Sequence, residues 1–263
     1  MLIDSHAHLT DPKYIDLEAL QKHWEANGIS NVFSIGYDME SSRQSIKIAE
    51  EKNSVYAIIG IHPDEIKDNT AENIAELKEL AKHPKVLAIG EIGLDYHNID
   101  SGNIAIKQAQ KDLFVSQIKL ADEVGLPIMI HLRDACGDML EILREYKSYL
   151  KSGVIVHCFS ESVETYEVLK SMDINLKIGV GGVVTFKNGK KIQEVVKKAD
   201  LSDIILETDC PYLTPEPYRG QTNEPAHILD IAYKICELKN VTMQELSNQT
   251  NQNIRDIFPK FRG

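Results

Sequence analysis

Two histidines stand two residues apart near the start of the chain, in the segment LIDSHAH at residues 2–8. In an extended strand, residues i and i+2 point to the same side, so His6 and His8 can present their imidazoles to one point. Two neutral imidazoles that converge in this way begin a metal site. The pair alone is equally typical of two surface histidines near a chain end, so its meaning depends on what else in the sequence converges on the same place.

Histidines and carboxylates recur at the ends of the predicted strands along the rest of the chain. Five of the nine histidines occupy such positions, while the other four fall in predicted helices or loops. A single residue of this kind is usually a hydrogen-bonded core or rim residue. Several of them gathered in one buried volume would be costly without a cation, so their convergence predicts a metal site. The residues at predicted strand ends are His6, His8, His62, Glu91, His131, His157, Glu207 and Asp209.

The number of potential ligands indicates two metal ions. A single tetrahedral ion takes about four ligands, whereas two ions roughly 3.5–4 Å apart accommodate six with a bridging group. A carboxylate has two oxygens and can bridge, whereas an imidazole cannot, so Glu91 is the natural bridge. The remaining predicted ligands are His6, His8 and Asp209 for one ion, and His131 and His157 for the other.

Such a centre predicts hydrolysis. A water molecule held between two cations loses a proton near neutral pH, so the expected nucleophile is a metal-bound hydroxide. We expect Asp209 to orient that water or to accept its proton. A Ser-His-Asp mechanism is not indicated, because the sequence contains no G-x-S-x-G motif.

The elements that must position these residues are short, nearly continuous apolar segments that alternate with helical patterns. Segments of this kind are expected of parallel strands that are buried on both faces. Eight of them predict the α/β class and a (β/α)8 TIM barrel, in which chemistry takes place at the carboxyl ends of the strands. A doubly wound open sheet is the alternative, since periodicity does not show closure. The predicted strands are residues 2–4, 31–36, 55–60, 86–93, 127–131, 153–159, 175–180 and 204–207.

Helical patterns and chain length agree with a barrel. Met139, Leu143 and Leu150 share one apolar stripe, and Thr242 with Glu245 predicts a capping box that opens a final helix. The length of 263 residues is close to the roughly 250 that are typical of a TIM barrel. No linker or change in composition divides the chain, so we expect one domain over residues 1–263.

The composition is that of an ordinary globular protein, but the formal net charge is −11. That charge argues against broad binding along duplex nucleic acid, which requires many Lys and Arg residues on one face, yet it permits a small cationic pocket for one phosphate. The four cysteines show no C-x-x-C spacing, and no apolar segment approaches the roughly 20 residues that span a membrane. With no room for a signal peptide ahead of the first strand, we expect a cytoplasmic protein with no membrane partner and no obligate protein partner.

Taken in order, the motifs around these residues resemble the TatD-related deoxyribonuclease family of the amidohydrolase superfamily, over essentially the whole chain. Each motif is weak alone, but the ordered set is specific. The matching segments are DSHAH at residues 4–8, GIHP at 60–63, GEIGLDY at 90–96, HLRDA at 131–135, HCFS at 157–160, ETDCPYL at 207–213 and RGQTNEP at 219–225.

The resemblance implies a distorted TIM barrel, a divalent-metal cofactor and hydrolysis of phosphodiester bonds in DNA. In this family a glutamate replaces the carboxylated lysine that bridges the metals of other amidohydrolases, and Glu91 is such a glutamate. The mixed ligands accept Mg²⁺, Mn²⁺, Zn²⁺ or Co²⁺. Glu161 and Cys210 depart from the usual family pattern, which puts substrate preference in question more than chemistry. The implied metal ligands are His6, His8, Glu91, His131, His157 and Asp209.

Other residues are expected to act on the substrate. We expect Asp209, Glu91 and His62 to take part in catalysis, with His62 also contacting the phosphate or the leaving group. Arg133 is a second candidate for phosphate contact, although a salt bridge at the rim is the alternative. The aromatic residues that can either stack on a base or pack at the barrel rim are Tyr96, Phe186 and Tyr212.

The acidic chain favours capture of a single-stranded DNA end or a small phosphodiester over tracking along a duplex. The predicted activity is therefore that of an exonuclease-like deoxyribonuclease. Because the same centre polarises a carbonyl, hydrolysis of an amide, ester or lactone is an alternative, as is removal of an aminoacyl group from a nucleic acid. A barrel that binds metal or nucleotide without turnover is the non-enzymatic alternative.

Overall fold

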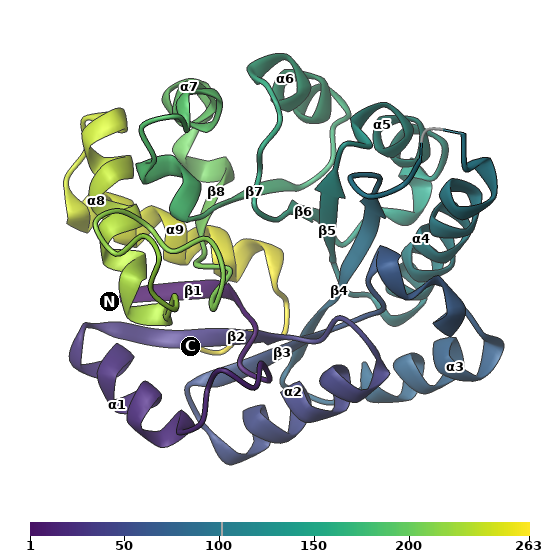
Figure 1. Ribbon diagram of the computed structural model, residues 1–263, viewed down its shortest axis with the longest axis horizontal. Coiled ribbons are helices and arrows are strands. Elements are labelled where there is room, and N and C mark those ends of the chain that lie inside the picture. Colours follow the sequence, from purple (N-terminus) through teal and green to yellow (C-terminus); the bar gives the residue numbers. More distant parts are fainter. Residues whose placement is uncertain (101) are drawn as a thin grey trace.

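The computed structural model describes residues 1–100 and 102–263, and Figure 1 shows strands enclosed by an outer layer of helices. Eight strands form one sheet, in which each strand pairs in parallel with the next strand along the chain. The strands are β1 (Leu2–Ala7), β2 (Ile29–Ile35), β3 (Val55–Ile59), β4 (Val86–Asp95), β5 (Ile128–Arg133), β6 (Val154–Val156), β7 (Leu176–Val180) and β8 (Ile204–Leu206).

The first and last strands meet, which closes the sheet into a barrel. A parallel bridge joins Ala7 to Cys210, and the His8 N–H donates to the Cys210 carbonyl at 2.8 Å. The buried carboxylate of Asp4 on β1 also accepts hydrogen bonds from the backbone N–H and the hydroxyl of Thr208, at 2.9 and 2.6 Å. The closure confirms the predicted TIM barrel and excludes the open sheet.

Helices follow the strands and cover the outside of the barrel (Figure 1). The predicted capping box at Thr242 and Glu245 is confirmed, and it opens the last helix. The helices are α1 (Leu17–Ala26), α2 (Met39–Glu51), α3 (Ala71–Leu80), α4 (Ile104–Val124), α5 (Cys136–Glu145), α6 (Val163–Ser171), α7 (Lys190–Lys198), α8 (Ile228–Lys239) and α9 (Met243–Ile257). Short 3-10 helices are η1 (Pro63–Asp68), η2 (Lys147–Tyr149), η3 (Gly182–Thr185), η4 (Leu201–Asp203) and η5 (Pro225–His227).

Side chains alternate along the strands between two buried clusters, as the two-residue period of a strand requires. Val32 and Ile59 belong to the cluster that packs against the helices. Their neighbours Phe33 and Ile58 belong to the second cluster, together with Met129, and this cluster fills the barrel. The interior is therefore a packed core that supports whatever lies at its open end. Helix α9 and the residues after it contribute four further side chains to the second cluster, namely Ile254, Ile257, Phe258 and Phe261.

Strand β6 ends earlier than the predicted 153–159, and the reason is local. Cys158 adopts a positive φ of 44°, which breaks the extended backbone. Its N–H donates to the side chain of Glu207 instead of continuing the ladder. His157 follows the strand directly, its N–H still donates to the Ile130 carbonyl on β5 at 3.1 Å, and its side chain lines the barrel mouth. Among the described residues, no helix is both long and apolar enough to cross a membrane.

Candidate metal centre

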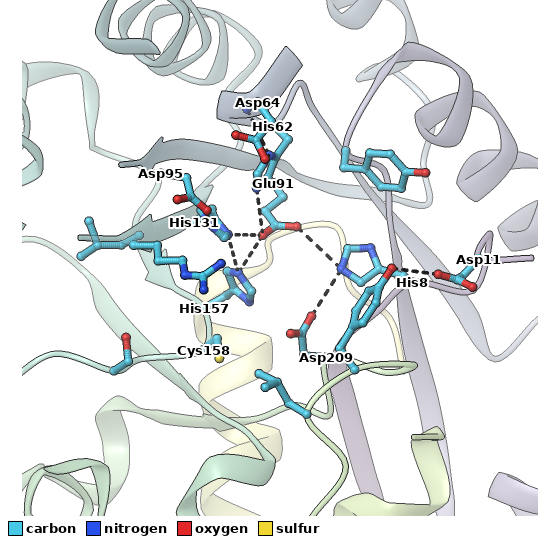
Figure 2. Close-up of a pocket in the computed structure, with 16 residues that line it drawn as sticks. His8, Asp11, His62, Asp64, Glu91, Asp95, His131, His157, Cys158 and Asp209 are labelled. Atoms are coloured by element: carbon cyan, nitrogen blue, oxygen red, sulfur yellow. Dashed lines mark hydrogen bonds and ion pairs between the residues drawn. The ribbon is translucent and has the colours of Figure 1, made fainter. Parts of the chain in front are cut away.

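A cavity of about 620 Å³ opens at the carboxyl ends of the strands and is lined by most of the predicted polar residues. His6 and Glu207 are fully buried beneath it. Figure 2 shows the Glu91 carboxylate at its centre, with His131 and His157 on one side and His8 and Asp209 on the other. The position is the one where TIM barrels carry their active sites. The size falls within the range of about 300–1,000 Å³ that is typical of ligand pockets.

Four ligand atoms surround one point on the β1 side of the cavity. The Nε2 atoms of His6 and His8 lie 3.4 Å apart. Oδ1 of Asp209 lies 3.6 Å from the first imidazole and 3.3 Å from the second. Oε2 of Glu91 lies 3.6 and 3.7 Å from the same two nitrogens. A tetrahedral ion with bonds of about 2.0–2.1 Å separates its ligand atoms by about 3.3 Å, so these spacings fit one divalent cation.

The other oxygen of Glu91 faces a second group. Oε1 lies 2.7 Å from Nδ1 of His131 and 2.8 Å from Nε2 of His157. The two ring nitrogens are 3.4 Å apart. The two contacts with Oε1 are hydrogen-bond distances, shorter than the roughly 3.3 Å between ligand atoms of one ion, so the side chains would have to separate slightly to admit a cation. The single carboxylate spans both groups, as a bridge between two ions must. The geometry therefore brings all six predicted ligands together around Glu91. The two groups are contiguous, because the ring of His6 also stacks on that of His157 with centroids 4.0 Å apart.

The charges of the centre suit cations. Burial works against an ionised Glu91, yet His157 and His131 hold the pKa of this carboxyl well below its usual range. Burial lowers the pKa of His6 to about 4, so this imidazole is neutral with a free lone pair. Burial works against an ionised Asp209 as well, but its hydrogen bond with His8 and the charges of the surrounding imidazoles together lower its pKa. Despite burial, which disfavours the protonated rings, nearby carboxylates raise the pKa of His131 to about 10 and also raise the pKa values of His8 and His157. A divalent metal binds the neutral imidazole, so metal binding at these three rings would displace their protons.

The two ring nitrogens of His8 and His157 differ in their surroundings. The buried Nδ1 atoms of His8 and His157 have no hydrogen-bond partner in the described part of the chain. Both rings thus aim their Nε2 atoms at the carboxylates of Glu91 and Asp209 and gain little else from burial. The Nε2 atoms, which face the carboxylates, are therefore the ones available to a cation.

Asp95 is a partner of the centre that sequence reasoning missed. Its Oδ2 lies 3.0 Å from Nε2 of His131, while Nδ1 of the same ring faces Glu91. A carboxylate behind a ligating histidine fixes the ring orientation and the position of its proton. The available signal was the spacing, because residues i and i+4 of an extended strand point to the same side.

Glu207 stabilises the turn that follows His157. Its carboxyl group is fully buried, and burial raises its pKa to about 8. Oε1 lies 3.8 Å from Nδ1 of His157 and accepts the N–H of Cys158. We infer a structural part for this residue, since it holds the turn that carries a ligand.

Of the five predicted substrate contacts, three line the cavity, namely His62, Arg133 and Tyr212. Nδ1 of His62 accepts the Asp64 N–H at 3.2 Å, and burial lowers the pKa of the ring, so its proton is on Nε2. That nitrogen lies 4.0 Å from Oε1 of Glu91. Arg133 lines the cavity, and its guanidinium has no hydrogen bond or ion pair within the described residues. Tyr96 is not brought to the cavity, because its hydroxyl donates to Asp138 on α5 at 2.7 Å.

The family model described as TatD related DNase matches residues 3–259. The chain belongs to this family. The Bacillus subtilis (strain 168) protein named uncharacterized metal-dependent hydrolase YabD is 42% identical, over 98% of this chain and 99% of its own. The Enterobacter lignolyticus protein named 3'-5' ssDNA/RNA exonuclease TatD is 30% identical, over 98% of both chains. The solved structure of YjjV, a TatD homologue from Escherichia coli, superposes with a TM-score of 0.89 at 27% identity and 98% coverage of both chains.

Membership of the TatD family confirms the resemblance that the ordered motifs carry. It also establishes the general chemistry, because the chain is a metal-dependent hydrolase of the TatD type. The side chains around Glu91 described above are the candidate metal-binding groups in the structure.

Proposed function

We propose that this TatD-family hydrolase cleaves phosphodiester bonds at the single-stranded ends of DNA, with two divalent cations held on the two sides of Glu91. The observation that carries the proposal is the division of ligand atoms between the two oxygens of that carboxylate. When bound, such a pair of cations supplies Lewis acidity and lowers the pKa of water to near neutrality. His6, His8, His131, His157 and Asp209 complete the two groups.

The chain's own residues then hold and move protons. Asp209 uses only Oδ1 in its contacts with the two imidazoles, which leaves Oδ2 to accept a proton from the attacking water. His62 presents an N–H at Nε2 beside Glu91, where it can donate to a phosphate oxygen or to the leaving oxygen. The guanidinium of Arg133 supplies a fixed positive charge at the rim, suited to a phosphate.

Two observations favour a single-stranded end of DNA as the substrate: the net charge of the chain and the name of a related protein. The chain carries a net charge of −11, and broad attraction to duplex DNA requires the opposite sign. A TatD relative that is 30% identical over nearly the full length is named a 3'-5' exonuclease of single-stranded DNA and RNA. A narrow acidic cavity with one cationic side chain suits a single frayed end better than a groove that tracks a helix.

A labelled single-stranded oligonucleotide tests the proposal directly. We expect release of mononucleotides with added Mg²⁺, Mn²⁺, Zn²⁺ or Co²⁺, slower release from a blunt duplex, and no release by the Glu91→Ala variant. A parallel measurement compares a bis-aryl phosphate with an aryl ester. Faster turnover of the ester, or no release of nucleotides with any of the four ions, would overturn the assignment to phosphodiesters.

A further inference from the structure

Two tyrosines at the cavity mouth lie outside the group of metal-ligand candidates. Tyr37 follows β2 and is 39% exposed, and Tyr212 lies in the loop after β8 and is 47% exposed. Both line the cavity. Their ring centroids are 6.0 and 5.9 Å from that of His8, and the planes are inclined by 65° and 69° to its ring. Two aromatic rings from separate loops thus stand beside the same ligand candidate, with much of their surface open.

Each tyrosine is held in place. The Tyr37 N–H donates to the hydroxyl of Ser41 in the first turn of α2, at 3.0 Å, and the Tyr37 carbonyl accepts the N–H of His62 at 2.7 Å. The Tyr212 hydroxyl donates to Oδ2 of Asp11 at 2.9 Å. The bonds of Tyr37 hold its backbone, and the bond of Tyr212 restrains its ring before any substrate arrives, which lowers the entropic cost of binding to it.

Further contacts hold Tyr212 and limit how it can be approached. Its carbonyl accepts a hydrogen bond from the amide of the buried Asn223 at 2.6 Å. The ammonium of Lys13 lies 4.6 Å from the centroid of its ring and covers one face. A planar ligand can therefore stack only on the opposite face.

The opposite side of the mouth carries the guanidinium of Arg133. Figure 2 shows His8 and Asp11 on one side of Glu91, and His131 with Asp95 on the other. In the register of the two strands, Arg133 on β5 lies opposite Asp95 on β4, so Arg133 belongs to the same side of the cavity as Asp95. The metal-ligand candidates thus separate an aromatic side, formed by the two tyrosines, from a side with a single guanidinium.

We propose that Tyr37 and Tyr212 form a stacking subsite for the base at the end of a single strand, and that Arg133 contacts the next phosphate of the continuing strand. This inference rests on the proposed function and adds where the two parts of the substrate lie. Every base has a π-face, so stacking is tolerant of sequence. A base within a duplex is already paired and stacked, so the subsite also accounts for a preference for unpaired ends.

Cleavage of paired substrates tests the subsite. One oligonucleotide carries a normal terminal nucleotide, and the other carries an abasic nucleotide in the same place. For the wild-type enzyme we expect loss of the base to lower kcat/KM by about 5-fold to 150-fold, the range found when stacking on an aromatic side chain is lost. Tyr37→Leu and Tyr212→Leu should lower kcat/KM on the normal substrate and remove most of the difference between the two.

Conservative and distant variants serve as controls. Tyr212→Phe keeps the ring but loses the bond to Asp11, so it should retain most discrimination. Tyr233 on α8 is 63% exposed and lies in neither the cavity lining nor the metal-ligand group, so Tyr233→Leu should behave as the wild type. Equal cleavage of both substrates by the wild type, or full discrimination by both leucine variants, would overturn the subsite while leaving the proposed function intact.

A binding measurement separates the two proposals if cleavage fails altogether. A terminal 2-aminopurine loses fluorescence when it stacks, and Asp209→Asn keeps the strand uncut. We expect the 2-aminopurine fluorescence to be quenched when the strand binds metal-loaded Asp209→Asn protein. We expect no quenching when the same protein also carries the substitutions Tyr37→Leu and Tyr212→Leu. Quenching that persists in that triple variant would overturn the subsite, whereas failure of the wild type to cleave any phosphodiester would overturn the proposed function.

Discussion

Replacing Asp95 with asparagine tests how one of the two proposed cations is held. Oδ2 of Asp95 lies 3.0 Å from Nε2 of His131, and Nδ1 of that ring lies 2.7 Å from Oε1 of Glu91. When Nδ1 binds a cation, the ring proton sits on Nε2 and donates to the carboxylate. An amide is a weaker acceptor than a carboxylate and can turn its NH₂ group toward the ring, so the ring loses its orientation.

The expected size of the effect follows from that contact. Partners of a ligating histidine typically change metal affinity by about 10–100-fold, which corresponds to about 1.4–2.7 kcal/mol. Asp95 contacts His131 and none of the atoms on the β1 side of Glu91. We therefore expect one of two dissociation constants to rise by about 10–100-fold, with the other unchanged within about threefold.

Competition with a chelator measures both constants. Manganese is titrated into metal-free wild type, Asp95→Asn and the matched control Asp134→Asn, whose carboxylate pairs with His97 at 2.8 Å on the exposed rim. Activity of Asp95→Asn should recover substantially at saturating Mn²⁺, because the ligands themselves remain. Equal weakening of both sites, or unchanged affinity at both, would refute the reasoning.

Four further changes have defined outcomes. Treatment with a chelator should abolish hydrolysis, and an added divalent ion should restore it; activity that survives removal of all metal, checked by elemental analysis, would contradict the proposed centre. Asp209→Asn should fold, as judged by circular dichroism, and lose activity by orders of magnitude; a fully active variant would remove this residue from the mechanism. Asn223→Ala should lower the free energy of unfolding by about 3 kcal/mol in urea titration, because it leaves the buried carbonyl of Thr208 and the half-buried carbonyl of Tyr212 without their donor, at about 1–3 kcal/mol for a buried group and less for a half-buried one. His23→Ala removes only an exposed ion pair with Glu224, so stability should change by less than about 1 kcal/mol and activity should be retained.

Much of the barrel could be predicted because its rules are local. Buried parallel strands are continuously apolar, and a ligand placed just after such a strand must lie at the mouth of the barrel. His131 at the end of β5 and His157 after β6 were found in this way, although 26 residues separate them in the chain. The bridging role of Glu91 also follows from its chemistry alone, since a carboxylate has two oxygens that can each bind a cation.

What could not be predicted depends on contacts between distant segments or on side-chain direction. Tyr96 directly follows Asp95, so its side chain points away from the cavity and its hydroxyl reaches Asp138. Tyr37 lies beyond the end of β2, in a turn whose path is set by α2 and by the backbone of His62. The hydrogen bond between Thr208 and Asp4 joins residues that are 204 positions apart, and no pattern within either segment predicts it.

Anomalous X-ray diffraction from crystals of metal-loaded protein tests the central claim most directly. The account predicts two peaks on either side of the Glu91 carboxylate, one within bonding distance of His6, His8 and Asp209, and the other within bonding distance of His131 and His157. A single peak that does not touch Glu91, or ions bound only outside the cavity, would contradict it.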